Sequence, residues 1–297
     1  MPTTTTPAPD RSGHLDVDGC RIHWERFGTG RRETVCLLNG LAMHTRAWSS
    51  FLPRLMPEFD IVLFDYPGQG QSSAEDAPCA IPRLGDYLAM ILDHLGIDRL
   101  HLMGISYGGF VALEFARRNQ HRLHTLTISG TLLSHETLFQ MYQDLSLRFY
   151  RGSLELFEVY THYLYEKIFG ESFATESYAA LEPMRQRFYD RYKDARHSLI
   201  RLTEAQIPLF ADLDLRLPEY AAIRTPTLIM AGAEDRAIPV QVQQKIGRIL
   251  PHTRFEIVDR CGHCVHLERS DVFFGQLAAF ARAHTLEFEI VGTEGEA

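Results

Sequence analysis

A serine between two glycines is the clearest candidate for a nucleophile in this chain. The segment Gly104-Ile-Ser-Tyr-Gly108 follows an apolar run that begins at Leu100, and a helical pattern, 111–118, comes directly after it. A serine held at a sharp strand-to-helix turn needs this context, because side chains two residues away on either side would collide with the neighbouring strand and helix. The turn also places the unpaired N–H groups of a helix N-terminus beneath the hydroxyl. We predict that Ser106 is a nucleophile; the alternative is a glycine-rich structural turn.

The acid and base that such a serine requires follow later in the chain. A serine hydroxyl is a weak nucleophile until a base takes its proton, and the base needs an acid that fixes its tautomer and stabilises its cation. Asp235 lies in a short loop after the apolar run 227–231, and His263 follows the run 254–258. The order serine, acid, histidine, each after a strand, is the order expected for this kind of turn. We predict that His263 is the base and Asp235 the acid.

Each of these partners has a rival nearby. Glu234 precedes Asp235, but the residues after Asp235 lead into a helix that starts with proline, which favours Asp235 as the acid. His266 is the other candidate base, while His263 has the advantage of following Gly262 directly. We expect His266 to be structural or to line the substrate pocket.

Acyl transfer also requires two hydrogen-bond donors for the negatively charged oxygen of the intermediate. We expect one from the backbone N–H of Tyr107 and the other from the backbone N–H of Leu41. Leu41 follows Asn39-Gly40 after the apolar run 34–38. Asn39 and Gly40 are therefore expected to contact the substrate, the alternative being an ordinary turn.

These residues must be positioned by a sheet and its helices. Short apolar runs of strand length lie at 34–38, 60–64, 100–103, 123–128, 226–231 and 254–258. Helices are expected at 46–56, 81–95, 111–118, 239–250 and 271–284, and a β-hairpin at 14–27 around Asp18-Gly19. Strands that alternate with helices predict an α/β fold with a mainly parallel, doubly wound sheet.

The alternation stops between 134 and 218, where only helical patterns rich in aromatic residues occur. An insertion between strands predicts a helical cap over the carboxyl edge of the sheet, where open α/β sheets bind ligands. We expect most of its aromatic residues to pack and a few, such as Phe139 and Tyr142, to contact the substrate. The predicted organisation is a disordered leader (1–12), a core (13–133 and 219–285), a cap (134–218) and an acidic tail (286–297).

Composition narrows the class of protein. The chain has 297 residues, 45% of them hydrophobic, and a formal net charge of −8 without a cluster of Lys and Arg, so nucleic acid is not an expected partner. No segment has the length of a membrane span, and the N-terminus lacks the apolar region of a secretory signal. An odd number of cysteines, five, does not suggest a disulfide framework. We expect a cytoplasmic protein, either a monomer or a homodimer.

A C-x-x-C pattern surrounds the candidate base, at Cys261-Gly-His-Cys264. Redox dithiols of this pattern lie near the start of a thioredoxin-like unit, whereas this one lies late in the chain. A zinc site would need a second ligand pair at suitable spacing. We therefore expect neither role, and hypothesise only that oxidation of these thiols perturbs His263.

With these residues considered together, the chain resembles the α/β-hydrolase superfamily over nearly its whole length. The resemblance rests on Asn39-Gly40, Gly104-Ile-Ser-Tyr-Gly108, Gly232-Ala-Glu-Asp235, the segment 262–268 and the glycine-rich turn 65–72. Most members have His-Gly where this chain has Asn39-Gly40. In this feature and in the flanking residues the chain is similar to the branch that transfers 3-hydroxyacyl groups to make precursors of rhamnolipids and polyhydroxyalkanoates. A serine in place of aspartate argues against dehalogenation, because a serine ether could not be hydrolysed as an aspartyl ester is.

The function expected from the sequence is hydrolysis of a small-molecule carboxylic ester or thioester through an acyl-enzyme, without a metal or an organic cofactor. Two alternatives remain open. One is acyl transfer to a hydroxyl or thiol acceptor instead of water. The other is a ligand receptor built on a hydrolase fold.

Overall fold

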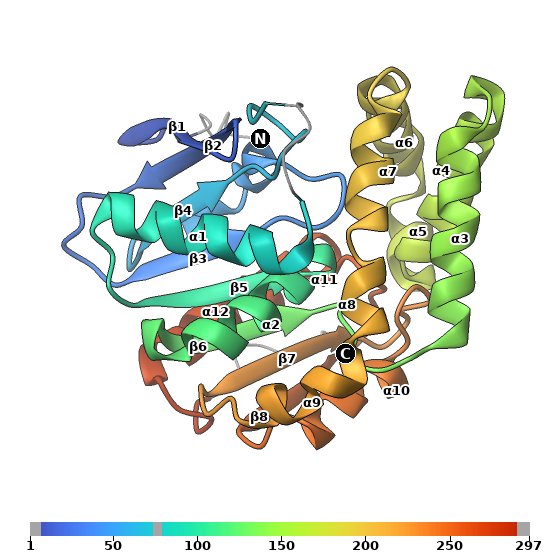
Figure 1. Cartoon of the computed structure of the whole chain (residues 1–297). Coiled ribbons are helices and arrows are strands. Elements are labelled where there is room, and N and C mark those ends of the chain that lie inside the picture. The colour runs from blue at the N-terminus through green and yellow to red at the C-terminus, as the bar shows by residue number, and fades with distance from the viewer. Residues whose placement is uncertain (1–6, 74–78, 290–297) are drawn as a thin grey trace.

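The computed structural model describes residues 7–73 and 79–289, and an eight-stranded sheet forms its centre (Figure 1). The strand order is β1-β2-β4-β3-β5-β6-β7-β8; the pairs β1–β2 and β2–β4 are antiparallel and the others are parallel. The strands are β1 (Arg11–Val17), β2 (Cys20–Phe27), β3 (Thr34–Leu38), β4 (Asp60–Phe64), β5 (Leu100–Ile105), β6 (Leu123–Ser129), β7 (Thr227–Gly232) and β8 (Thr253–Val258). The predicted fold class is confirmed.

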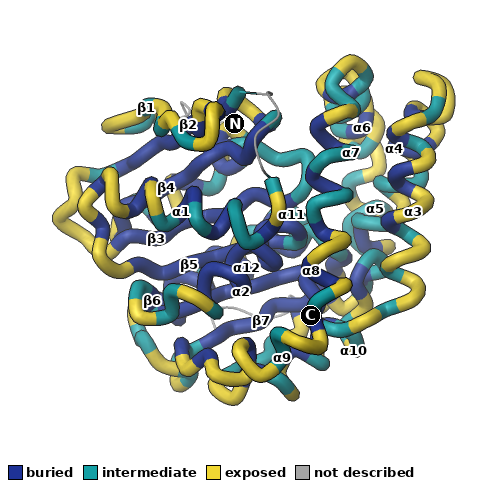
Figure 2. The backbone as a smooth tube through the Cα atoms, in the orientation of Figure 1, coloured by how far each residue is buried: buried dark blue, intermediate teal, exposed yellow. Residues whose placement is uncertain are grey.

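Helices cover both faces of the sheet, and Figure 2 shows the inner strands, such as β3, β4, β5 and β7, as buried and the edge strand β1 as largely exposed. The helices around the sheet are α1 (Ile81–Leu95), α2 (Tyr107–Asn119), α10 (Val240–Gln243), α11 (Val265–Glu268) and α12 (Ser270–Ala283). The 3-10 turns are η1 (Thr45–Trp48), η2 (Leu52–Arg54), η3 (Gln120–Arg122) and η4 (Gln244–Arg248).

Two hydrophobic cores form because side chains alternate along a strand. In β3, Val35 and Leu37 pack in the core that includes residues of η1, η2 and α12. Cys36 and Leu38 pack in the core on the opposite face, which includes residues of α1 and α2. A strand buried on both faces reads as a continuous apolar run, which is why the sequence predicted β3 correctly.

A helical segment separates β6 from β7 and lies beside one edge of the sheet in Figure 1. It has a small aromatic core of its own, which includes Tyr150, Phe157 and Tyr160. Its helices are α3 (Thr137–Arg151), α4 (Leu154–Ile168), α5 (Glu171–Glu176), α6 (Tyr178–Tyr192), α7 (Arg196–Glu204), α8 (Ile207–Ala211) and α9 (Leu213–Ala221). Helix α9 runs past residue 218, where the sequence placed the end of this segment.

The helix predicted at 46–56 is wrong. The chain forms the short turns η1 and η2 there instead. The Thr45 N–H donates to Asp65 Oδ1 (2.7 Å) and the Trp48 indole donates to Asn39 Oδ1 (2.7 Å), so tertiary hydrogen bonds fix this segment. Pro53 has no N–H to continue a helical ladder. The helix predicted at 239–250 begins at Val240 as expected but tightens into η4 from Gln244.

The chain ends differ from the predicted leader and tail. Strand β1 begins at Arg11, and the Gly28 N–H donates to the Asp10 carboxylate (2.6 Å), so the ordered chain starts before residue 13. At the other end Arg254 donates to the carbonyl oxygens of Leu286 and Phe288, and its guanidinium lies 4.2 Å from the Phe288 ring centroid. The first residues of the predicted tail therefore pack on β8. Residues 1–6 and 290–297 lie outside the described part.

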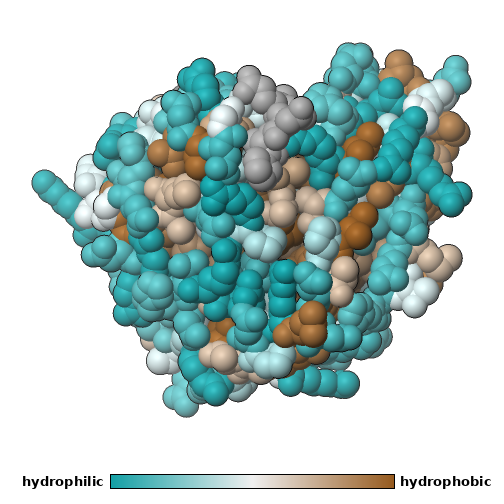
Figure 3. All heavy atoms as spheres, in the orientation of Figure 1, coloured by the Kyte–Doolittle hydropathy of each residue, from teal (hydrophilic) through white to brown (hydrophobic). Residues whose placement is uncertain are grey.

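The surface is mainly hydrophilic, with hydrophobic side chains concentrated along the helical segment (Figure 3). The large apolar side chains exposed in that segment are Leu138, Met141, Leu145, Leu154, Leu156, Val159, Tyr178, Ile207 and Leu215. Over residues 7–73 and 79–289, no helix combines the length and the apolar character needed to cross a membrane.

Candidate active site

Ser106 lies at the turn between β5 and α2 in a strained backbone conformation. Its φ is +49°, a value that residues with side chains seldom adopt. A Cβ atom at Gly104 would lie 2.3 Å from the Gly108 carbonyl oxygen, and one at Gly108 would lie 2.6 Å from the Leu38 carbonyl oxygen. Both glycines are thus required by close backbone approach, the physical reason anticipated from the sequence.

The structure brings the three predicted polar side chains together at the ends of β5, β7 and β8. His263 Nε2 lies 2.9 Å from Ser106 Oγ, and His263 Nδ1 lies 2.9 Å from Asp235 Oδ2. Because an ionised carboxylate only accepts hydrogen bonds, Nδ1 carries the proton and Nε2 is left to accept from the serine hydroxyl. A serine in this arrangement can lose its proton to the imidazole as it attacks a carbonyl carbon.

Opposing influences act on the pKa of His263. Burial lowers this pKa, but the charge of Asp235, its hydrogen bond and the charge of Glu268 together raise it more, so the pKa lies above its usual value of 6.5. The imidazolium that would form during a reaction is therefore stabilised by Asp235. This is the electrostatic role that an acid has beside a catalytic histidine.

Asp235 is held by groups that sequence reasoning missed. Its Oδ1 accepts from the N–H groups of Ala237 and Ile238, both at 2.8 Å, and its Oδ2 accepts from the Gln243 side chain at 3.0 Å. The fully buried Gln243 also accepts from the Gly130 N–H (2.9 Å), which ties α10 to the end of β6. Gln243 faces Asp235 one helical turn into α10, but only the fold gives it Gly130 as a partner.

The rival acid and the rival base have other partners. The Glu234 carboxylate accepts from both the N–H and the hydroxyl of Ser172 in α5, so it connects the acid loop to the helical segment. His266 is buried beside the Trp48 ring, with the ring centroids 5.5 Å apart. Burial and the neighbouring His263 lower the pKa of His266 to about 3. His266 lines the cavity described below. This is one of the two places expected for it from the sequence.

Glu268, the last residue of the motif segment 262–268, organises the loop that carries His263. Its carboxylate accepts from the N–H groups of Gly262 (2.8 Å), Cys264 (3.0 Å) and Gly170 (2.9 Å). The first two flank the histidine, and the third belongs to the link between α4 and α5. The position of His263 thus depends on a partly buried carboxylate that also holds the helical segment.

The expected oxyanion donors lie beside Ser106. Tyr107 is the first residue of α2, so its N–H has no acceptor within the helix, and Leu41 and Gly40 line the cavity on the loop after β3. Asn39 was expected to contact the substrate, but it is buried and is not among the residues that line the cavity. Its amide donates to the Phe64 carbonyl (2.9 Å) and accepts from Trp48, so its side chain is buried beneath the loop.

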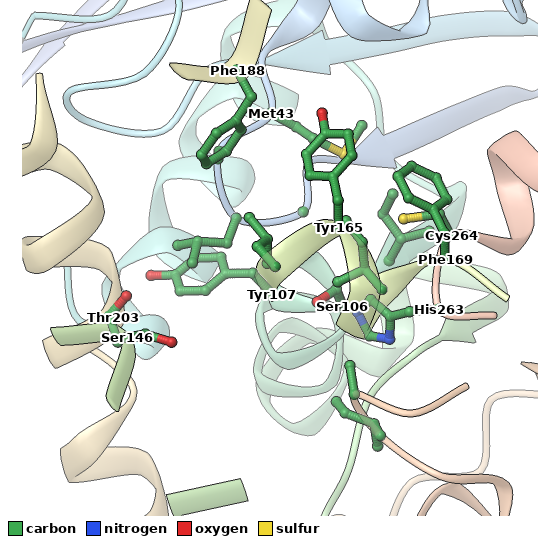
Figure 4. Close-up of a pocket in the computed structure, with 18 of the residues that line it drawn as sticks. Met43, Ser106, Tyr107, Ser146, Tyr165, Phe169, Phe188, Thr203, His263 and Cys264 are labelled. Carbon is green, nitrogen blue, oxygen red and sulfur yellow. Dashed lines mark hydrogen bonds between the residues drawn. The ribbon is translucent and has the colours of Figure 1, made fainter. Parts of the chain in front are cut away.

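A cavity of about 300 Å³ opens above Ser106 between the sheet and the helical segment (Figure 4). Phe139 and Tyr142 line it, as expected, together with aromatic residues that include Tyr165, Phe169 and Phe188. Within the described part of the chain, no Asp, Glu, Lys or Arg contributes to its wall. The cavity therefore suits a largely apolar and uncharged substrate.

The cysteines on either side of His263 are free thiols. Burial raises the pKa of both Cys261 and Cys264, so little thiolate exists at neutral pH. Since the thiolate is the reactive form, this environment favours inert thiols.

Comparison with known proteins agrees with the architecture. A family model described as alpha/beta hydrolase fold matches residues 33–270. The chain therefore belongs to the α/β-hydrolase family, as the resemblance of its motifs implied. Among its members the chain is 28% identical to a 2-hydroxy-6-oxononadienedioate/2-hydroxy-6-oxononatrienedioate hydrolase from Cupriavidus pinatubonensis, over 85% of this chain and 88% of that protein. It is also 28% identical to a 2-hydroxy-6-oxo-6-phenylhexa-2,4-dienoate hydrolase from Burkholderia cepacia, over 85% and 88% of the two chains.

Solved structures show the same fold at low sequence identity. An α/β-hydrolase enzyme from a deep-sea metagenome library superposes with a TM-score of 0.85 at 22% identity, covering 94% of this chain and all of the other. The enol-lactonase from Burkholderia xenovorans gives a TM-score of 0.75 at 21% identity, covering 90% of this chain and 98% of the other.

Proposed function

We propose that this hydrolase cleaves a carboxylic ester or thioester through an acyl-enzyme on Ser106, with Asp235 and His263 as its partners. His263 Nε2 takes the hydroxyl proton as Ser106 Oγ attacks the carbonyl carbon, and the N–H groups of Leu41 and Tyr107 hold the oxyanion. The proton then passes to the leaving oxygen or sulfur as its bond to carbon breaks. His263 next takes a proton from water, which attacks the acyl group and frees Ser106.

One observation carries this proposal: the unbroken hydrogen-bonded series from Asp235 through His263 to Ser106, with both distances at 2.9 Å. It ends at a cavity whose wall is largely apolar. We also propose that the segment 134–218 acts as the cap of that cavity, because Tyr165, Phe169 and Phe188 of this segment line the cavity together with Ser106 (Figure 4). In line with the composition we propose a cytoplasmic enzyme.

The relatives support a second candidate, hydrolysis of a carbon–carbon bond. Their names describe 2-hydroxy-6-oxo dienoates and dienedioates, which contain a ketone and carboxylates but no ester. A carboxylate inside the cavity of this chain would be desolvated without a cationic partner on the described wall, which is unfavourable. The neutral wall therefore favours ester or thioester cleavage.

The test compares p-nitrophenyl esters from acetate to laurate in the wild type and in Ser106→Ala, with a 2-hydroxy-6-oxo dienoate beside them. We expect ester turnover that depends on Ser106 and slower turnover of the dienoate. Faster turnover of the dienoate would favour the second candidate. A stoichiometric burst followed by near-zero turnover would indicate a receptor, and turnover only after addition of an alcohol or thiol would indicate an acyltransferase.

A further inference from the structure

We propose that the cavity has a polar end, formed by Tyr107, Gln143 and Thr203, that binds an uncharged hydrogen-bonding group at the far end of the substrate's acyl chain. The proposal rests on the proposed function, since it concerns the substrate of the same site. The group would be a hydroxyl, a carbonyl or an amide.

Polar atoms without partners mark this end of the cavity. Tyr107 OH, Gln143 Nε2 and Thr203 Oγ1 are buried and have no hydrogen-bond partner among the described residues. Their residues are exposed by only 1%, 8% and 3%, and all three line the cavity. A buried polar atom left without a partner costs about 1–3 kcal/mol. The three atoms come from three elements, α2, α3 and α7. In Figure 4 the Tyr107 hydroxyl, Thr203 and Ser146 lie on the same side of the cavity, and Gln143 precedes Ser146 by one helical turn of α3.

The neighbouring hydroxyls do not supply the missing partners. Ser146 Oγ donates to the Tyr142 carbonyl (2.8 Å), Tyr160 OH donates to Ser146 Oγ (2.9 Å), and Tyr150 OH lies 3.1 Å from Tyr160 OH. Because the Tyr160 proton is already committed, Tyr150 must donate to Tyr160. This series is satisfied by itself and forms a rigid polar wall beside the unpartnered atoms.

The location relative to the nucleophile fits one substrate spanning both. Tyr107 is adjacent to Ser106, and in Figure 4 its hydroxyl points away from Ser106 and His263, toward the side on which Ser146 and Thr203 lie. A substrate whose carbonyl carbon lies at Ser106 would thus extend its acyl chain along Tyr107 toward Thr203. No Asp, Glu, Lys or Arg lies on the described wall, so the tip is an uncharged group.

The test uses p-nitrophenyl esters of ω-hydroxyalkanoic acids, from butyrate to octanoate, and the methyl-ended esters with the same number of heavy atoms. We expect the hydroxyl-ended ester of the best length to have a kcat/KM about tenfold higher in the wild type. Thr203→Val and Gln143→Leu should bring that ratio close to one. Met184→Leu, an apolar change in the same cavity, should preserve it. Thr203→Val should also raise Tm, because it removes a buried atom without a partner.

Two measurements separate this proposal from the proposed function. Ser106-dependent hydrolysis of p-nitrophenyl acetate, which is too short to reach the polar end, reports only on the function. Calorimetry on Ser106→Ala, with and without Thr203→Val, reports only on the polar end. It compares the binding of two methyl ketones, one whose chain ends in a hydroxyl group and one whose chain ends in a methyl group. Equal affinity for the two ketones, or a preference that survives Thr203→Val, would overturn the proposal even if esters are hydrolysed.

An independent cluster lies away from this cavity, where β3, β5 and β6 begin. We infer that Glu33, His101 and His284, whose ligand atoms lie within 4.8 Å of one another, form a site for a divalent metal ion of the Zn²⁺ type, with His124 packed beside it. The Nε2 atoms of His101 and His284 lie 3.3 and 3.0 Å from Glu33 Oε2, and His124 Nε2 lies 3.9 Å from Oε1. The three imidazole rings contact one another, with centroids 4.9 to 5.2 Å apart.

These spacings suit a tetrahedral ion. Zn²⁺ binds imidazole nitrogen and carboxylate oxygen at about 2.0–2.2 Å, so the ligand atoms of a tetrahedral site are about 3.4 Å apart. The buried His101 has its Nδ1 2.9 Å from Thr125 Oγ1, the kind of second contact that leaves Nε2 free to bind a metal. Glu33 and His284 are partly exposed, which leaves an entry path. A bound ion would join the end of α12 to β5 and to the start of β3.

The test is a titration of the metal-stripped protein with Zn²⁺. We expect binding of one equivalent by elemental analysis after desalting and a rise in Tm that saturates at that ratio. The double variant His124→Gln/His284→Gln should lose both, while His14→Gln, remote from the cluster, should keep them. Binding that is absent from the wild type, or unchanged in the double variant, would overturn the inference.

Discussion

The protonation state of His263 decides whether Ser106 can react. In the proposed mechanism the imidazole must be neutral to accept the serine proton. Its pKa lies above 6.5 because Asp235 and Glu268 together outweigh burial. Activity should therefore fall as the pH is lowered through a value above 6.5. Changing the charge of the acid is the most direct way to test this relation.

We predict that Asp235→Asn lowers kcat/KM by about 10⁴, since an amide favours the wrong imidazole tautomer. It should also move the acidic limb of the pH profile to lower pH, because burial alone lowers the pKa of His263. The profile of kcat/KM between pH 5 and about pH 9 is the measurement. Glu234→Gln is the matched control: a small effect is expected, and a larger loss than that of Asp235→Asn would make Glu234 the acid.

Sequence reasoning named the residues of the reacting series but not the residues that hold them. Ser106, Asp235 and His263 each follow a strand in a recognisable order, so local patterns were sufficient. Gln243 and Glu268 contact the loops of Asp235 and His263 directly, but their other partners, Gly130 and Gly170, lie far from them in the chain. Pairings over such separations are set by the fold, and no spacing within the sequence reveals them.

At the scale of elements, the loop between β8 and α11 depends on Glu268. We predict that Glu268→Gln lowers the free energy of unfolding by about 1–3 kcal/mol, because the amide cannot accept at both oxygens from the N–H groups that the carboxylate serves. It should also lower kcat by loosening His263. Urea unfolding followed by circular dichroism measures the first effect. The exposed Glu155→Gln in α4 should change stability by about 0.5 kcal/mol or less; equal effects of the two variants would contradict this role.

The same loop carries the thiols that the sequence suggested as an oxidation-sensitive pair. Because burial raises the pKa of both Cys261 and Cys264, we predict that peroxide inactivates the wild type and Cys261→Ala/Cys264→Ala at the same rate. Residual esterase activity over time is the measurement. Protection in the double variant would show instead that these thiols control His263.

Strands were easier to predict than the short turns. Residues 34–38 and 60–64 are continuous apolar runs because the sheet is covered on both faces, and both strands have the predicted bounds. The segment 46–56 has helical spacing, but it forms short turns, and hydrogen bonds from Thr45 to Asp65 and from Trp48 to Asn39 tie these turns to other loops. Tertiary contacts there outweigh local preference, which a local pattern cannot show.

Over the whole molecule, charge is separated from the site. The chain has a net charge of −8, while the described wall of the cavity holds no ionised residue of the Asp, Glu, Lys or Arg type. The helical segment contributes much of that wall, and Glu268 and Glu234 bind it to the loops of His263 and Asp235. Substrate selection and positioning of the base are therefore linked through the same segment.

The central claim is that Ser106 carries the acyl group, and rapid-quench mass spectrometry of the intact protein tests it most directly. Mixed with excess p-nitrophenyl butyrate and quenched in acid within milliseconds, the wild type should gain the mass of a single butyryl group, located on the peptide that contains Ser106. Ser106→Ala should gain none. Turnover without this adduct, or an adduct of the same size on Ser106→Ala, would contradict the account.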